Sequence, residues 1–389
     1  MTILHIALAC PFDEEMSYQE NLLSKYNARD GHVVILLTTC YKWDNSGRMI
    51  YTPPEDRLMG DGVRLVRMNY HRIINEYITL KIRKVDGVYN FIEQIAPEII
   101  FFHGPQTVEL LTIVKYIQAF PRTRLFIDNH ADFSNSATNY ISLRILHKGL
   151  WRYVAKKAEP YTARFYGVLP SRVSFLINIY KIDKKNCELL LMGADDDKVR
   201  LARESNPRSK IRLKLGISNN DFLIVTGGKI DESKAQILLL LQAVKSLNAP
   251  NVKLIIFGSI ISKLKKQVLS FVDNTNIFYL GWLNTDQIYS YFAASDLAAF
   301  PGRHSVLWEE AVGFGIPCIF KYWDETTHID VGGNCRFLFD DRADEIKLVL
   351  EEIINNPDEF DKMKTVASQI GVNKFSYQQI SRRAVQSAT

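Results

Sequence analysis

The sequence predicts an α/β protein made of two parallel-sheet domains that face each other across a cleft. Short apolar runs alternate with amphipathic segments through both halves of the chain, which is the pattern of strands joined by helical crossovers. A polar, charged stretch between Gly193 and Pro207 separates the two halves, after which the alternation begins again. The length of 389 residues also exceeds what one ordinary hydrophobic core supports.

These observations predict four segments. We expect an N-terminal Rossmann-like domain over residues 1–193, a linker over 194–207 and a second domain over 208–375. Residues 376–389 are expected to form a helix that packs back on the first domain.

The composition is that of a globular protein, with 47% hydrophobic and 23% charged residues. The net charge of +5 fits a protein that binds anionic small molecules or an anionic surface, and it does not require nucleic acid. The five cysteines are scattered and lack C-x-x-C spacing, which favours reduced thiols in a cytoplasmic protein over a disulfide framework or a zinc site. Residues 1–9 lack the features of a signal peptide, and no apolar run is long enough to span a membrane.

The chain opens with the pattern of a βαβ unit. Residues 3–10 predict a buried strand, a helix begins at Tyr18, and residues 33–38 predict the second strand. The intervening loop carries Asp13, Glu14 and Glu15 where a dinucleotide-binding loop would need glycines, so NAD is disfavoured. Residues 41–62 are expected to be mostly loop.

Two strands of the first half are expected to deliver a histidine to the carboxyl edge of the sheet. His103 follows the apolar run 98–102, and His130 follows the run 125–128. Ligands of open α/β sheets bind at this edge, although each histidine taken alone is more often structural than catalytic.

Residues 139–164 form a basic segment in which Arg144, Lys148, Arg152 and Lys156 recur every four residues. A helix would place these cations on one face beside apolar and aromatic side chains, as in helices that lie on anionic membranes. An ordinary solvated helix face is the alternative. Nucleic acid is disfavoured, because the rest of the chain has no further basic stripe.

The second half places glycines and two lysines at strand ends. Lys229 follows a strand and the pair Gly227-Gly228, and Lys234 lies near the start of the next helix. Two ammonium groups beside glycine backbone and a helix N-terminus suit a diphosphate. Gly258 and Gly281 end the next two strands, and they would let a ligand lie against the backbone.

Residues 300–321 predict a strand end, a polar loop, a helix and a further strand. The loop carries Arg303, His304 and Ser305, and the helix carries Glu309 and Glu310 in its interior. This arrangement gathers backbone N–H groups, a cation and carboxylates at one rim of the sheet.

Several of these runs together resemble the donor domain of the retaining family-four glycosyltransferases, which have the GT-B fold and use nucleotide-diphosphate sugars. The resembling runs are V-T-G-G-K-I-D-E-S-K, L-I-I-F-G-S, F-Y-L-G-W-L, S-D-L-A-A-F-P-G and E-E-A-V-G-F-G-I-P-C. The opening I-L-H-I-A-L-A-C-P-F, the run D-G-H-V-V-I-L-L-T-T and the run L-M-G-A-D resemble the N-terminal half of the same family. The resemblance covers nearly the whole chain and is more specific in its second half.

The resemblance implies roles for individual residues. Lys229 and Lys234 match the pair that grips the donor diphosphate, next to Gly228 and Gly258 in the donor site. The turn at Gly281, Trp282 and Leu283 matches the segment that binds the base through backbone groups. Glu310 matches the glutamate that holds the ribose, and His130 matches the N-domain histidine at the donor sugar. Glu309 then has no assigned role and is expected to be helix surface.

The resemblance fails at one position. The first glutamate of the family's pair should stand at residue 302, where this chain has Gly302. The glycine-rich loop that follows is here replaced by Arg303, His304 and Ser305. We therefore expect Arg303 or His304 to take over part of the sugar or phosphate contact.

Taken together, the residues and the resemblance predict a glycosyltransferase that needs neither a metal nor another cofactor. The donor would be a nucleotide-diphosphate sugar, with UDP favoured, and the acceptor a glycan or lipid-linked molecule in surface-polysaccharide or glycoconjugate synthesis. Retention at the anomeric carbon is implied by the family. The protein would be cytoplasmic or peripheral on the inner face of the membrane, which residues 141–157 would contact. The alternatives are a nucleotide-sugar epimerase of the same fold and a non-catalytic partner of another transferase.

Overall fold

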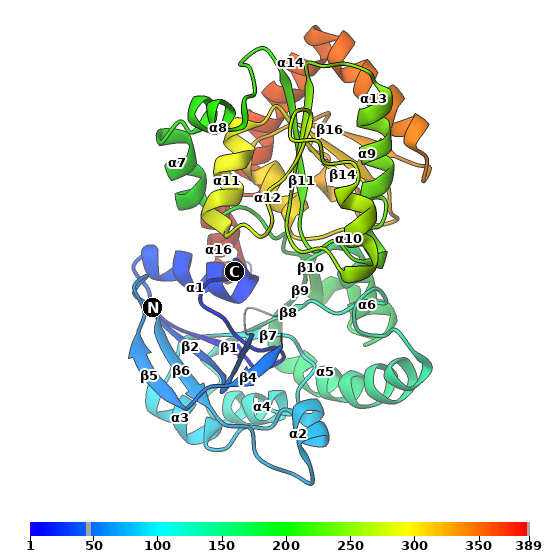
Figure 1. Cartoon of the computed structure of the whole chain (residues 1–389). Coiled ribbons are helices and arrows are strands. Elements are labelled where there is room, and N and C mark those ends of the chain that lie inside the picture. Colours follow the sequence, from blue (N-terminus) through cyan, green and yellow to red (C-terminus); the bar gives the residue numbers. More distant parts are fainter. Residues whose placement is uncertain (44–47, 387–389) are drawn as a thin grey trace. The chain divides into compact units, whose positions relative to one another are not determined.

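The computed structural model describes residues 1–43 and 48–386, and they divide into two compact units. Unit 1 comprises Met1–Leu191 and Ile380–Thr389, and unit 2 comprises Met192–Gln379. Figure 1 labels the elements of both units, which are described separately below.

Unit 1 is built on an eight-stranded sheet with the order β10-β9-β8-β7-β1-β2-β6-β5. Every neighbouring pair is parallel except β5 and β6. The chain runs outward from β1 through β2 to β6, and then returns to the other side of β1 with β7, so the strand order reverses between β1 and β7. The strands are β1 (Thr2–Ala7), β2 (Val33–Thr39), β5 (Glu55–Leu58), β6 (Arg64–Met68), β7 (Ile99–His103), β8 (Arg124–Asn129), β9 (Thr162–Gly167) and β10 (Cys187–Leu189).

Helices cover both faces of this sheet, with α1 on one face and α3 and α4 on the other (Figure 1). The central strands β1, β7 and β8 are almost entirely buried, as continuous apolar runs predict for a parallel sheet covered on both faces. The helices are α1 (Gln19–Arg29), α2 (Glu76–Ile82), α3 (Val88–Ile95), α4 (Leu110–Ala119), η1 (Ser142–Trp151), α5 (Arg152–Ala158), η2 (Glu159–Tyr161), α6 (Pro170–Asn178) and η3 (Lys184–Asn186).

Unit 2 is built on a six-stranded, wholly parallel sheet with the order β13-β12-β11-β14-β15-β16. The chain again runs outward from its first strand, β11, and returns beside it with β14. The order therefore reverses between β11 and β14, and ligands of open α/β sheets bind beyond the strand ends at such a point. The strands are β11 (Phe222–Gly227), β12 (Val252–Phe257), β13 (Ile277–Tyr279), β14 (Leu297–Phe300), β15 (Cys318–Lys321) and β16 (Cys335–Leu338).

In unit 2, α9 and α13 lie on one face of the sheet, and α11 and α12 lie on the other (Figure 1). Helix α16 begins in unit 2 and continues into unit 1. The helices are α7 (Asp196–Glu204), α8 (Arg208–Leu215), η4 (Glu232–Lys234), α9 (Ile237–Ser246), α10 (Ser262–Leu269), α11 (Thr285–Ala294), α12 (Leu307–Phe314), η5 (Thr327–Ile329), α13 (Ala343–Asn355), α14 (Pro357–Val366), η6 (Ala367–Gly371), α15 (Val372–Lys374) and α16 (Tyr377–Gln386).

The structure differs from the sequence-based expectation in two segments. Within 41–62, part of which (44–47) lies outside the described residues, there are three short strands: β3 (Tyr41–Trp43), β4 (Met49–Tyr51) and β5. Two of them, β4 and β5, are largely exposed; β4 has only three apolar residues, and β5 has three charged residues and one leucine. The stretch 194–207 contains helix α7, whose N-cap Asp195 accepts a hydrogen bond from the backbone N–H of Asp197.

All five cysteines are free, as their scattered spacing predicted. Among the described residues, no helix is both long and apolar enough to cross a membrane.

Candidate functional site

A pocket opens at the point in unit 2 where the strand order reverses, between the ends of β11 and β14. Its lining comes from the end of β11, the η4–α9 segment, the loop after β14 and the first turn of α12. The lining residues are Thr226, Gly227, Ile230, Lys234, Ile237, Phe300, Pro301, Gly302, Arg303, Ser305 and Trp308.

Lys234 and Arg303 give this pocket its charge. Among its described lining residues no carboxylate is present. Burial lowers the pKa of Lys234, and the positive charges of Arg303 and Lys229 lower it further, against the opposing effect of Asp231. Three cations therefore act on one small volume, and the N-terminus of α12 adds the positive end of a helix dipole. The pocket is suited to an anion.

The loop after β14 packs tightly on η4. The backbone N–H of Arg303 donates a hydrogen bond to the carbonyl of Ser233 at 3.4 Å. A Cβ at position 302 would lie 3.0 Å from the Cα of Lys234, closer than side chains normally approach a neighbouring backbone. The backbone in this position leaves little room for the glutamate that the resemblance leads one to expect at residue 302.

The glycines at the strand ends of unit 2 allow two backbone segments to approach each other closely. Gly258 has φ +109°, and a Cβ there would lie 1.9 Å from the carbonyl oxygen of Gly228. Its N–H donates to the carbonyl of Gly281 at 2.7 Å. The close approach at Gly258 is therefore made by Gly228, whereas the space around a Cβ at Gly281 is open. In the turn that follows, Trp282 is 68% exposed and Leu283 is buried.

His304 and Glu309 form a buried network with His328. The Nε2 atom of His304 lies 2.8 Å from Oε1 of Glu309, and Nε2 of His328 lies 2.9 Å from the same oxygen. Glu309 is fully buried, so the expectation that it would be helix surface is wrong. Burial alone would raise the pKa of Glu309, but the two histidines lower it to about 2. The network anchors the loop through His304, while Arg303 and Ser305 line the pocket.

Glu310, the next residue on α12, is also buried, but its pKa is shifted in the opposite direction to that of Glu309. Burial is the main reason that its pKa rises to about 8; the charges of Glu309 and Asp195 add to the rise, and Lys198 opposes it. The carboxyl group of Glu310 is therefore mostly protonated at neutral pH.

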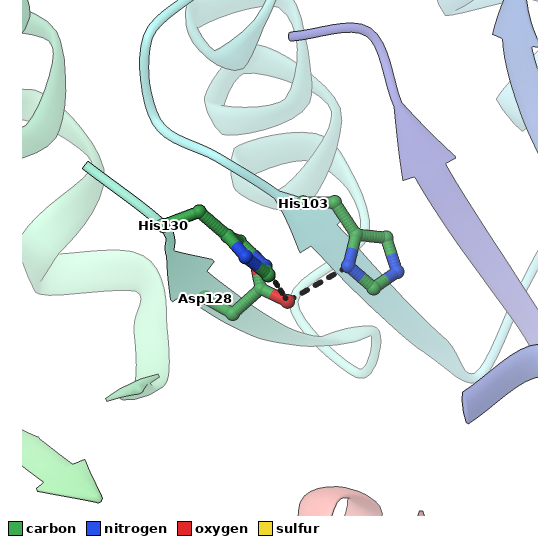
Figure 2. A group of neighbouring side chains, drawn as sticks. All are labelled: His103, Asp128 and His130. Carbon is green, nitrogen blue, oxygen red and sulfur yellow. Dashed lines mark hydrogen bonds and ion pairs between the residues drawn. The ribbon is translucent and has the colours of Figure 1, made fainter. Parts of the chain in front are cut away.

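In unit 1, His130 lies at the end of β8 next to a buried acid–histidine pair (Figure 2). Its Nε2 atom lies 3.3 Å from Oδ2 of Asp128, and this oxygen is 2.8 Å from Nδ1 of His103. His103 and Asp128 are buried, whereas the side chain of His130 is 35% exposed. Both histidines lie at the carboxyl edge of the sheet, as their positions after two apolar runs predicted.

Two groups of side chains have the ligand types of a metal site: His103, Asp128 and His130 in unit 1, and His304, Glu309 and His328 in unit 2. In a tetrahedral zinc site with bonds of about 2.0–2.1 Å, neighbouring ligand atoms lie roughly 3.3 Å apart. The contacts of 2.8 and 2.9 Å instead match hydrogen bonds between imidazole N–H groups and a carboxylate. The His304–Glu309–His328 group therefore has the geometry of a hydrogen-bonded network, whereas the 3.3 Å between Nε2 of His130 and Oδ2 of Asp128 equals the spacing of zinc ligands.

Residues 207–369 match the family model described as glycosyl transferases group 1. Among solved structures, HepE of Anabaena in complex with UDP is similar at a TM-score of 0.69 and 15% identity, covering 98% of this chain and 97% of that one. Sucrose-phosphate synthase from Thermosynechococcus elongatus is similar at a TM-score of 0.71 and 13% identity, covering 99% and 97%. The chain has the GT-B fold.

A putative UDP-N-acetylglucosamine 2-epimerase from Listeria monocytogenes is similar at a TM-score of 0.63 and 12% identity, covering 98% of this chain and 94% of that one. No curated protein matches this chain by sequence. At such low identities the solved structures establish the fold, and the match over unit 2 identifies a glycosyl transferase group 1 domain there.

The structure brings only some of the predicted donor residues into the pocket. Lys234, Arg303 and Ser305 line it, whereas Lys229 is exposed and outside the lining. Trp308 also lines the pocket and was not predicted; an apolar residue inside a helix gives no functional signal in the sequence. His5 and His328 were also not predicted as part of these networks, because their partners lie far away along the chain.

Proposed function

We propose that this protein transfers a sugar from a nucleotide-diphosphate sugar to a glycan or lipid-linked acceptor, which unit 1 holds. The observation that carries the proposal is the pocket at the β11/β14 reversal, which is lined by Lys234, Arg303 and Ser305 and by no carboxylate among its described residues. The glycosyl transferase group 1 domain over the same unit supports it. UDP is favoured as the nucleotide, in keeping with the family resemblance.

In the proposed reaction, the acceptor hydroxyl oxygen bonds to the anomeric carbon while the bond from that carbon to the β-phosphate oxygen breaks. The hydroxyl proton passes to the leaving diphosphate, and the configuration at the anomeric carbon is retained. Lys234 and Arg303 would offset the charge that develops on the diphosphate, a task for which many enzymes use a metal ion. We therefore propose transfer without a resident metal, with His130 acting at the donor sugar.

Arg303→Ala tests the role of the loop. We expect this substitution to weaken binding of UDP roughly 10–100-fold, since a charge-assisted hydrogen bond contributes about 1.5–3 kcal/mol. Lys266→Ala is the control, because Lys266 is an exposed cation on α10 that does not line the pocket. Equal affinities of the Arg303 variant and the wild type, measured by calorimetry, would remove Arg303 from the donor site.

We further propose that the acceptor is lipid-linked and that the η1–α5 segment contacts an anionic membrane. Tyr140, Ile141, Ile145 and Tyr153 are 55–74% exposed on this segment. Residues 133–158 contain five cations and no aspartate or glutamate. Apolar side chains interleaved with cations are typical of helices that lie at the membrane interface.

The four evenly spaced cations of this segment are not equivalent. Arg152 donates to the carbonyl of Ile179 at 2.7 Å, and Lys156 pairs with Glu159, so both have structural partners. Arg144 is exposed, and Lys148 is partly exposed. The double substitution Arg144→Glu and Lys148→Glu should abolish co-sedimentation with vesicles of phosphatidylglycerol. Retention of vesicle binding by this variant, or equal binding of the wild type to vesicles of phosphatidylcholine alone, would contradict the membrane proposal.

One assay separates transfer from the two alternatives. Purified protein is incubated with nucleotide sugars, with and without an acceptor extract, and both the released nucleoside diphosphate and the sugar are analysed. Acceptor-dependent release supports transfer. Interconversion of the sugar without an acceptor would indicate an epimerase, and binding with neither outcome would indicate a non-catalytic partner.

A further inference from the structure

Between the pocket-lining residues Arg303 and Ser305, the side chain of His304 contacts a buried carboxylate instead of the pocket. Its Nε2 atom lies 2.8 Å from Oε1 of Glu309, and Nε2 of His328 lies 2.9 Å from the same oxygen. The side chains of His304, Glu309 and His328 are 12%, 0% and 4% exposed. One buried oxygen that accepts from two rings fixes the positions of both. The loop after β14 is therefore tied to the η5 segment, which carries His328.

This network does not require a charged histidine. A neutral ring with its proton on Nε2 donates one hydrogen bond, so two such rings suffice for the oxygen that they share. Nδ1 of His328 is buried and has no hydrogen-bond partner among the described residues, which suits an unprotonated nitrogen. Oε2 of Glu309 is likewise buried without a partner in the described part of the chain. The carboxylate of Glu309 therefore depends on these two rings, and the loss of either one removes half of its hydrogen bonds.

The start of the same loop has two weaker attachments. The backbone N–H of Arg303 donates to the carbonyl of Ser233 at 3.4 Å, and Nε1 of Trp323 lies 3.5 Å from the carbonyl oxygen of Gly302. Both distances are longer than those of ordinary hydrogen bonds, which cluster near 2.9–3.0 Å. The 2.8 Å contact of His304 is shorter than either, so it is the strongest of the three attachments.

His304 also packs behind the wall of the pocket. The centroid of its ring lies 5.1 Å from that of Trp308, and the two planes meet at 70°. Trp308 is fully buried and lines the pocket. A displaced His304 would thus disturb both the loop that bears Arg303 and this part of the pocket wall.

We propose that His304, Glu309 and His328 are positioning residues that hold Arg303 at the donor pocket. None of the three belongs to the described lining of the pocket, so they act through Arg303 and not by touching the donor. Glu309 is fixed within α12, and the two rings bring the loop and the η5 segment to it. The inference rests on the proposed function only in taking the diphosphate of the donor as the anion that Arg303 binds.

A double-mutant cycle on UDP affinity tests this coupling. His304→Leu should weaken UDP binding roughly 3–30-fold in calorimetry, in line with the coupling between residues that act together. In an Arg303→Ala background the same substitution should change the affinity less than about twofold, because the residue through which His304 acts is gone. His304→Gln keeps an N–H donor for Glu309 and should restore most of the affinity. Equal losses in the two backgrounds would overturn the proposal.

Hydrogen exchange of the backbone N–H groups of residues 302–305, measured without nucleotide, tests the positioning itself. His304→Leu should speed exchange at Arg303 by at least about threefold, because local opening becomes easier. Arg208→Leu is the matched control: Arg208 shares the carboxylate of Asp296 with Arg212, both at 2.7 Å. Asp296 directly precedes β14, whereas the pocket loop follows this strand.

The control should leave exchange in 302–305 unchanged. An equal increase in both variants, or no increase in His304→Leu, would contradict the proposal. If His304→Leu fails to fold, His328→Leu removes the second donor to Glu309 and enters the same two measurements.

The two measurements also separate this inference from the proposed function. If the wild type binds neither UDP nor another nucleoside diphosphate, the donor site is wrong, and exchange alone decides whether the network positions the loop. If UDP binds and exchange accelerates while the affinity is independent of His304, the network holds the loop without positioning Arg303, and the proposal is wrong.

Discussion

Replacing Glu309 or Glu310 by glutamine should change the stability of unit 2 in opposite directions. Both side chains are buried in the first turn of α12. The pKa of Glu309 falls from its usual 4.5 to about 2, and that of Glu310 rises from 4.5 to about 8. Replacement by glutamine removes the charge at either position and keeps the size of the side chain.

The expected magnitudes follow from proton linkage, in which one pKa unit corresponds to about 1.36 kcal/mol. For Glu310, the unfolded chain loses its proton near pH 4.5 and the folded chain near pH 8, so its contribution makes the protein less stable as the pH rises between these values. At pH 7 the cost is about 3 kcal/mol. Glu309 has the opposite sign: its contribution to stability is fully present above pH 4.5, is about 3 kcal/mol at pH 7, and is lost as the pH falls towards 2.

We therefore expect Glu310→Gln to stabilise unit 2 at pH 7 by about 3 kcal/mol, and Glu309→Gln to destabilise it by a similar amount. For a unit of this size, 3 kcal/mol corresponds to roughly 6–12 °C in Tm. Thermal unfolding between pH 5 and pH 8.5 measures both effects, read from the transition that UDP shifts. The gain in Glu310→Gln should shrink towards pH 5.

Two results would refute this reasoning. If Glu310→Gln is no more stable than the wild type at pH 8 or if its advantage is independent of pH, the carboxyl group is not held neutral by burial. If Glu309→Gln is as stable as the wild type at pH 7, the contacts with His304 and His328 do not stabilise the ionised form.

Two further predictions concern the pocket and the strand ends of unit 2. Lys234→Ala should weaken UDP binding roughly 10–100-fold in calorimetry, since it removes a cation that lines the pocket, and undiminished affinity would exclude Lys234 from the donor site. Gly258→Ala should lower the stability to denaturant by at least ~2 kcal/mol, because the new Cβ would meet the carbonyl of Gly228, whereas Gly281→Ala should cost only ~1 kcal/mol. Similar losses for the two alanines would show that the close approach at Gly258 does not govern stability.

The sequence was sufficient to predict the strands of both sheets that are buried on both faces, because continuous apolar runs mark them. The expected strand 33–38 lies within β2, and the run 125–128 lies within β8. Short exposed strands such as β5 have no such pattern, and their pairing depends on a neighbour that periodicity cannot identify. Likewise, the polar stretch after Gly193 was expected to be a linker, but it contains the start of helix α7, which Asp195 caps.

Within the site, the sequence indicated some of the residues that line the pocket, but it gave no sign of contacts between residues far apart in the chain. Arg303 could be singled out because it follows a strand end, and Lys234 because it lies near a helix start. The burial of Glu309 could not, since its partner His328 lies 19 residues further along the chain. The link from His5 to His103 spans 98 residues and depends on the order of the strands in the sheet.

The tight packing at Gly302 has a consequence for redesign of this protein. Any residue with a side chain at this position places a Cβ 3.0 Å from the backbone of Lys234, so the lysine would have to shift along with it. A single substitution of Gly302 by glutamate would thus displace a cation of the pocket while adding a carboxylate. Redesign of position 302 would therefore require compensating changes in η4. These two stretches are far apart in the chain, but their packing couples them, so they have to be changed together.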